Sequence, residues 1–134
     1  MIAELITRLA PLQSIGTVVT VANALTASPT DLHADEAKLP AVYLYPGDDQ
    51  PDGGGYDGCP DIMISEAVHV LYVCAPGDLD AVKQGVRELL IGYQPTGKQR
   101  QLDFVVGGII PDGIRGTLVW YRDIFTTSYF QTTS

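Results

Sequence analysis

The alternation of apolar side chains is strongest between residues 61 and 74 (DIMISEAVHVLYVC). In an extended strand these side chains divide between two faces, with Ile62, Ile64, Val68, Val70 and Tyr72 on one and Met63, Ala67, Leu71 and Val73 on the other. Because the second half is apolar on both faces, it needs cover above and below and a neighbour on each side. We therefore predict a central strand that ends at Pro60 on one side and at Pro76 on the other.

Near the N-terminus, apolar residues recur at the spacing of one helical face, at Ile2, Leu5, Ile6 and Leu9. Pro11 ends this short predicted helix because the residue before a proline is driven out of helical space. The β-branched stretch at residues 15–21 (IGTVVTV) predicts a strand. Residues 22–38 contain turn-forming residues, and the pattern leaves their conformation open.

A second predicted helix follows the central strand directly. Asp78 can cap its N-terminus, and Gly92 supplies the C-terminal stop. Its buried stripe is expected to comprise Leu79, Val82, Val86, Leu89 and Leu90. Its polar face is expected to meet water through Lys83, Gln84, Arg87 and Glu88.

Three further strands are expected at residues 39–45 (LPAVYLY), 102–110 (LDFVVGGII) and 117–130 (TLVWYRDIFTTSYF). Pro40 suits an edge or entry position, and Gly107-Gly108 predicts a bulge or bend. A turn is expected at Pro111-Asp112-Gly113. The order α, β, β, β, α, β, β predicts an α+β fold with a mixed, mainly antiparallel sheet and two helices packed on it.

Residues 46–60 (PGDDQPDGGGYDGCP) contain five glycines and four aspartates, which predicts a long loop. Such a loop is costly to order alone, so we expect it to be mobile in the free chain and to settle against a partner. Its start resembles a calcium loop, with candidate ligands at Asp48, Gln50 and Asp52 before Gly53. The twelfth position, where a calcium loop needs a bidentate glutamate, is Cys59. We therefore favour contact with a partner protein over calcium binding.

Length and composition restrict the class of protein. We expect residues 1–134 to form a single domain, since a chain of this length can bury a core. Its net charge of -8 would repel a phosphate backbone, which argues against nucleic-acid binding. The N-terminus lacks the pattern of a signal peptide and no apolar run is long enough to cross a bilayer, so a soluble protein with reduced Cys59 and Cys74 is expected.

Candidate catalytic and metal-binding residues lack the companions that such chemistry needs. His33 and His69 have no nearby partner at metal-ligand spacing, and His69 is expected to be a hydrogen-bonded core or interface residue. Glu66 is expected to pair with Arg122 across the sheet. We therefore predict no enzyme activity, no cofactor and no metal site. A metal-dependent enzyme that uses the aspartate loop with His69 remains the alternative from a different class.

Three segments together carry a resemblance to a known family: residues 39–44 (LPAVYL), residues 89–95 (LLIGYQP) and residues 119–127 (VWYRDIFTT). The chain resembles, over residues 2–130, the tail terminator or tail completion proteins of long-tailed bacteriophages. This resemblance implies a structural virion protein with an α+β fold that assembles as a hexameric ring. Such a ring caps the tail tube, ends its polymerisation and forms the surface that joins the head. The implied location is the virion tail, and the host cytoplasm during assembly.

The resemblance also implies the partners: further copies of the chain, the tail tube protein and the head-tail connector protein, with the tail sheath protein as a further candidate. Genomic DNA would pass the acidic lumen without specific binding. A head-tail connector ring or a tail assembly factor is the nearest alternative. The expected subunit or partner contacts lie in the aspartate loop and the aromatic last strand, at Asp48, Asp49, Asp52, Tyr56, Asp57, Trp120, Tyr121, Phe125 and Tyr129. About half of the aromatic stripe is expected to be core.

Overall fold

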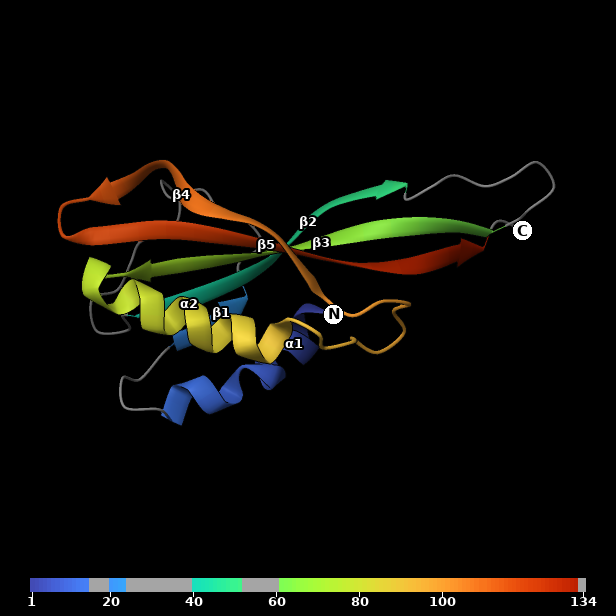
Figure 1. Cartoon of the computed structure of the whole chain (residues 1–134), viewed down its shortest axis with the longest axis horizontal. Helices are drawn as coiled ribbons and strands as arrows, with labels where there is room; N and C mark the ends of the chain where they lie inside the picture. Colours follow the sequence, from blue (N-terminus) through green and yellow to red (C-terminus); the bar gives the residue numbers. More distant parts are fainter. Residues whose placement is uncertain (15–19, 24–39, 52–60, 133–134) are drawn as a thin grey trace.

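The computed structural model describes residues 1–14, 20–23, 40–51 and 61–132. Its elements are α1 (Ile2–Arg8), the 3-10 helix η1 (Ala10–Ser14), β1 (Thr20–Asn23), β2 (Ala41–Pro51), β3 (Asp61–Cys74), α2 (Pro76–Leu90), β4 (Asp103–Arg115) and β5 (Leu118–Thr132). The strands form one five-stranded sheet in the order β1-β2-β3-β5-β4 (Figure 1). β1 and β2 are parallel and all other neighbours are antiparallel, so the predicted α+β class and element order are confirmed.

The strand β3 is the centre of the sheet, as its sequence predicts. It pairs over its whole length with β5 and, on its other side, with β2. Residues 70–74 are fully buried, because both faces of this half are covered. A strand that is apolar on both faces is stable only where both faces are covered, so this pattern favours the central position.

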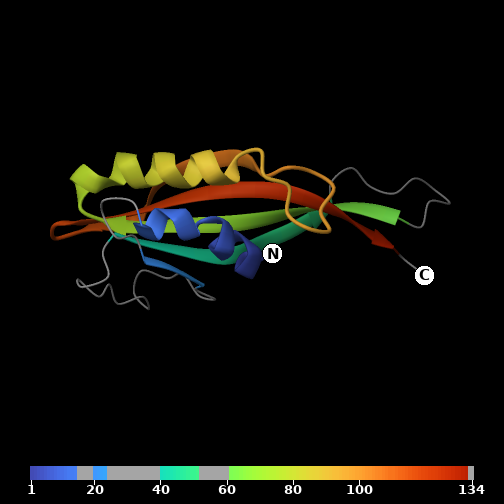
Figure 2. The same cartoon turned by 90° about the horizontal axis from the view of Figure 1, so that it is seen from below.

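The main core lies between the sheet and the helices, which cover one face (Figure 2). Helix α1 and its C-cap contribute Leu5 and Leu9 to it, and α2 contributes Val82, Val86 and Leu90. A second, smaller cluster lies on the opposite face and comprises Ala41, Tyr45, Leu71, Val73, Ile110 and Trp120. The ends of β2, β3 and β5 project beyond the helix layer on the side of the C-terminus (Figures 1 and 2).

The strand β2 corrects the predicted loop at residues 46–60. Residues 46–51 continue the strand and pair with β3, after a register shift between Pro46 and Asp49. Pairing with β3 stabilises this segment as a strand although it contains turn-forming residues. Pro40 precedes an internal strand, so it occupies the entry position rather than an edge. Residues 52–60 lie outside the described part of the chain.

The strand β4 corrects two further expectations. Gly107 and Gly108 pair regularly with Asp123 and Arg122, so they do not form a bulge. The register instead shifts between Phe104 and Val106 and again between Ile109 and Ile114. The predicted turn at Pro111-Asp112-Gly113 falls inside this second irregularity, and the chain reverses at Gly116, whose φ is 59°.

Helix α2 begins earlier than Asp78 suggests. Ala75 is the N-cap and makes no side-chain cap hydrogen bond, Pro76 is the first helical residue, and Asp78 lies in the first turn. Gly92 follows the helix with a φ of 85°, so the predicted stop is confirmed. No helix among the described residues is long and apolar enough to span a membrane.

Several expectations fall partly or wholly outside the described residues. The strand expected at residues 15–21 is seen at Thr20 and Val21, which begin β1. His33 and Cys59 are not described, whereas Cys74 is a free thiol buried at the end of β3.

Candidate subunit interface

A partly buried ion pair links α2 to the sheet. The Arg87 guanidinium donates two hydrogen bonds to Asp123 on β5, from Nε to Oδ2 at 2.9 Å and from Nη2 to Oδ1 at 2.8 Å. The Tyr72 hydroxyl also donates to Asp123 Oδ2, at 2.7 Å. Asp123 is fully buried, so these three bonds compensate the cost of taking its charge out of water. The expectation that Arg87 faces water is therefore wrong.

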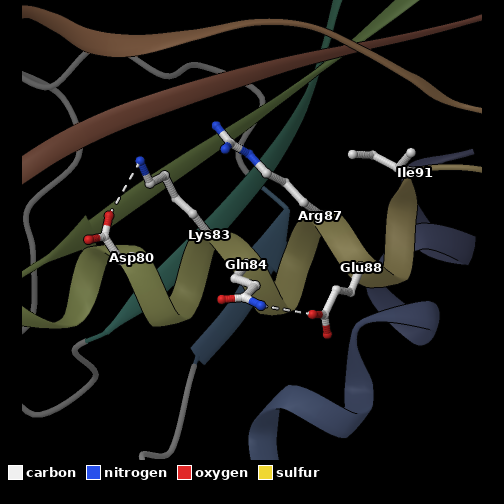
Figure 3. Close-up of a pocket in the computed structure, with 6 residues that line it drawn as sticks. All are labelled: Asp80, Lys83, Gln84, Arg87, Glu88 and Ile91. Atoms are coloured by element: carbon white, nitrogen blue, oxygen red, sulfur yellow. Dashed lines mark hydrogen bonds and ion pairs between the residues drawn. The ribbon is translucent and has the colours of Figure 1, made fainter.

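The neighbouring Lys83 also turns to the sheet. Its ammonium group lies 4.2 Å from the centre of the Tyr121 ring, and it forms a 3.7 Å ion pair with Asp80 on the same helix. Figure 3 shows Lys83 and Arg87 pointing toward the strands, whereas Gln84 and Glu88 lie on the other side of the helix. These two exposed residues confirm the predicted polar face for half of its members.

The outer side of α2 borders a shallow groove of about 650 Å³, lined by Asp80, Lys83, Gln84, Arg87, Glu88 and Ile91 (Figure 3). The Arg87 guanidinium, which lines this groove, lies 4.5 Å from the centre of the Phe104 ring on β4. The two acidic and two basic residues of the groove leave it without a net charge.

The edge strand β4 is the most apolar exposed part of the described chain. Seven large hydrophobic side chains are exposed among the described residues, and six of them lie on β4 or directly after α2: Ile91, Phe104, Val105, Val106, Ile109 and Ile114. β4 pairs only with β5 in the sheet, so its outer backbone groups have no strand partner among the described residues. Long apolar edges invite strand pairing with another chain.

The second sheet face carries two smaller hollows that meet at Ile124. One of about 170 Å³ lies over residues 106–111 with Arg122, and the other, of about 250 Å³, includes Asp48 and His69. His69 packs edge-to-face on Tyr45 with ring centres 4.8 Å apart, and its buried Nδ1 has no hydrogen-bond partner within the described part of the chain. The prediction that His69 is hydrogen-bonded is therefore not met at this atom. Burial, followed by nearby Arg122, lowers the pKa of His69, and Asp48 partly opposes this shift.

At the projecting end of the sheet, the structure brings together two of the predicted contact residues. The Tyr129 hydroxyl donates to Asp49 Oδ2 at 3.2 Å. Lys98, in the connector after α2, lies 4.6 Å from the centre of the Tyr129 ring and forms an ion pair with Glu66. The predicted pair of Glu66 with Arg122 is therefore wrong, because alternate residues of β3 and β5 place Arg122 on the opposite face.

No protein-family model matches this chain, and its sequence matches no curated protein. Its fold is similar to that of a chain in a structure of the virion of a native gene transfer agent (GTA) particle. The match has a TM-score of 0.60 at 12% sequence identity and covers 97% of this chain and 92% of the other. At this identity, the likeness establishes a shared fold over nearly the whole of both chains.

The predicted contact residues of the last strand have mixed positions. Trp120 and Phe125 are buried in the two cores, whereas Tyr121 and Tyr129 are half-buried. β5 is an internal strand between β3 and β4, so its backbone offers no open edge. Asp48 and Asp49 are exposed on β2, and Asp52, Tyr56 and Asp57 lie outside the described residues. A contact role for the exposed members stays a prediction.

Sequence reasoning missed the edge position of β4. The signal was present, since residues 104–106 are three consecutive apolar residues and Ile109 and Ile110 are adjacent. Successive side chains of a strand point to opposite faces, so consecutive apolar residues leave some apolar side chains exposed unless both faces are covered. Among the described residues, no group of three or more His, Cys, Asp or Glu side chains is arranged to hold a metal ion.

Proposed function

We propose that this chain is a structural protein of a phage-like virion. The observation that carries the proposal is the shared fold with a chain of the GTA virion, which extends over nearly the full length of both chains. Two features of the chain itself support it. The groove along α2 is open and shallow, whereas enzyme pockets enclose most of a ligand. The exposed apolar side chains of the described residues are concentrated on one sheet edge, which suits assembly with other proteins.

Within that class, the role we propose is termination of the tail tube. Six copies would close a ring on the end of the tube, stop further addition of tube protein and offer their outer surface to the head-tail connector. The resemblance of residues 39–44, 89–95 and 119–127 to tail terminators supports this role. The acidic Asp48 and Asp49, near the C-terminal end of β2, are the proposed contacts to the tube or connector.

The net charge of -8 per copy gives the assembly a dependence on salt. Copies in a ring repel one another through their excess carboxylates, and salt screens this repulsion. We therefore expect a monomer in dilute, low-salt solution and a ring at higher salt or on a finished tube. A ring that closes only on a finished tube does not compete with tube growth.

The test is electron microscopy of particles produced with and without this protein. With the protein, tails should have a uniform length and carry heads. Without it, tubes should vary in length and lack heads, because nothing ends their polymerisation. Tails of uniform length that join heads normally in its absence would refute the terminator role. Purified protein added back should restore head joining to finished tails.

A further inference from the structure

We propose that two copies of this chain join edge to edge through β4, related by a two-fold axis that passes beside Gly108. β4 is an outer strand of the sheet, and the chain is described on both sides of it, over residues 61–132 (Figure 1). The two β4 strands would run antiparallel, so that the two sheets become one. Such a contact uses the same surface on both copies and closes as a dimer. It is distinct from the head-to-tail contacts of a ring, and it does not rest on the proposed function.

The ladder between β4 and β5 places the residues of β4 symmetrically about Gly108. Gly108 pairs with Arg122 of β5, and Asp103 and Arg115 pair with the residues four positions after and four positions before Arg122. A two-fold axis beside Gly108 would therefore set Asp103 of one copy opposite Arg115 of the other, and this pair would form twice. Opposite charges directly across neighbouring strands stabilise a sheet.

The apolar residues of β4 follow the same symmetry. Phe104 and Ile114, which are 39% and 67% exposed, pair with the residues three positions on either side of Arg122, so they would lie opposite each other across the axis. Gly107 and Ile109 pair one position on either side, so a large side chain would lie over a residue without one. These four residues all pair with odd-numbered residues of β5. They therefore share one face of the sheet, as residues opposite each other must.

The exposed surface of β4 suits a weak dimer. At about 200 Å² per large side chain, the exposed fractions of its five exposed apolar residues amount to roughly 500 Å² on each copy. These residues are Phe104, Val105, Val106, Ile109 and Ile114. A standard interface buries about 800 Å² on each partner. The contact is smaller than that, so the dimer should separate on dilution.

The irregular part of β4, at residues 110–113, turns onto the second face of the sheet. Ile110 within it is 7% exposed and packs with Trp120 in the second cluster. Asp112 belongs to the same irregular part and has no position in the ladder, so no residue of the second copy would lie directly opposite it. The ladder positions that carry the symmetry stay on the edge.

The other charged groups near the edge do not oppose the contact. Lys83 and Arg87 of α2 already form ion pairs with Asp80 and Asp123. The Arg122 residues of the two copies would lie three strand spacings apart, which is about 14 Å. This distance exceeds the Debye length of about 8 Å at physiological ionic strength, so their repulsion is screened.

Two further charged residues lie off the line where the copies meet. Glu88 is on the other side of α2 (Figure 3). Arg100 precedes the start of β4, in the connector after α2. The charges that face each other across the axis are therefore those of Asp103 and Arg115.

Exchange of charge tests this pair. Asp103→Arg and Arg115→Asp each set like charges opposite each other twice in the dimer, so each should raise its dissociation constant at least tenfold. A mixture of the two variants restores both attractive pairs and should form a heterodimer within threefold of the wild-type affinity. Sedimentation velocity over a concentration series measures the constants, native mass spectrometry identifies the heterodimer, and circular dichroism checks each fold. Single variants that dimerise like wild type, or a mixture that does not pair, would overturn the inference.

A cross-link at the axis gives a test that does not depend on charge. Gly108 has room for a side chain, and its two copies would lie about 4.5–5.5 Å apart between Cα atoms, within the range of a disulfide. In a Cys59→Ser background, where Cys74 is buried, mild oxidation of Gly108→Cys should give a linked dimer. Phe130→Cys, at a residue 51% exposed on β5, should stay monomeric. Equal cross-linking of the two variants, or a wild type that is monomeric at every concentration, would refute the two-fold contact.

Discussion

Arg87 and Asp123 form a two-bonded ion pair that joins the last turn of α2 to β5, with heavy-atom distances of 2.8 and 2.9 Å. The carboxylate is fully buried, whereas the side chain of Arg87 keeps 30% of its surface exposed. The hydrogen bonds to Asp123 raise the pKa of Arg87, so the guanidinium remains charged at all working pH values. Because the same guanidinium stacks on Phe104, this pair also links the helix to the edge strand β4.

Replacing Arg87 by methionine should lower the free energy of unfolding by about 3 kcal/mol, because the Asp123 carboxylate stays buried without its cation. Lys83→Met is the matched control on the same helix. It removes a cation over Tyr121 and a surface ion pair, so it should cost about 0.5–1 kcal/mol. Urea unfolding of both variants measures the difference. Equal losses in the two variants would contradict a structural role for the Arg87–Asp123 pair.

Gly107→Ala should destabilise the protein by about 1–3 kcal/mol, because the added methyl group has no room. A Cβ at this position would lie 2.9 Å from the Tyr121 Oη and 3.1 Å from Arg87 Nη2, and closer still to Asp123 Oδ1. At Gly108, a Cβ would meet no atom of the described residues within 4 Å, apart from its two chain neighbours. Gly108→Ala should therefore be close to neutral. Thermal melting of the two variants compares them, and a stable Gly107→Ala protein would show that the ion pair tolerates displacement.

The His69 ring should make the protein less stable as the pH falls below about 6.5. Its pKa is lowered in the folded protein, so the unfolded chain binds the proton first, and the stability present above pH 6.5 is lost toward acid. One such group contributes at most about 1.4 kcal/mol per pH unit. Urea unfolding at pH 7.5 and 5.0 should show a larger loss for wild type than for His69→Gln. Parallel losses would mean that His69 titrates as it does in the unfolded chain.

The Cys74 thiol should affect the stability of the protein at alkaline pH. Burial raises the pKa of its thiol from 9.0 to about 11, so the unfolded chain loses the proton first. The resulting contribution to stability is complete below pH 9 and is lost as the pH rises through 11. Cys74→Ala should flatten the alkaline part of the stability profile relative to wild type. In native wild type at pH 8, alkylation of this buried thiol should be slow and should accelerate on unfolding.

The elements whose signal is local follow directly from the amino-acid sequence. Residues 61–74 alternate with apolar side chains on both faces, and only a strand with neighbours on both sides can bury both rows. Helix α2 likewise follows from its apolar stripe and from Gly92, since helical spacing and a positive φ are properties of a few adjacent residues. With the two helices and five strands in this order, the α+β class followed.

Tertiary structure alone decided what lies beside each element. Residues 46–51 carry turn-forming residues, yet pairing with β3 makes them a strand. Arg87 has the sequence context of a solvent-facing residue, and only the approach of Asp123 from 36 positions away draws it toward the sheet. The aromatic residues of β5 suggested a shared surface, but the crossover from β3 through α2 to β4 leaves β5 inside and β4 outside. Strand order depends on contacts between distant segments, and the side-chain pattern of a single segment does not encode it.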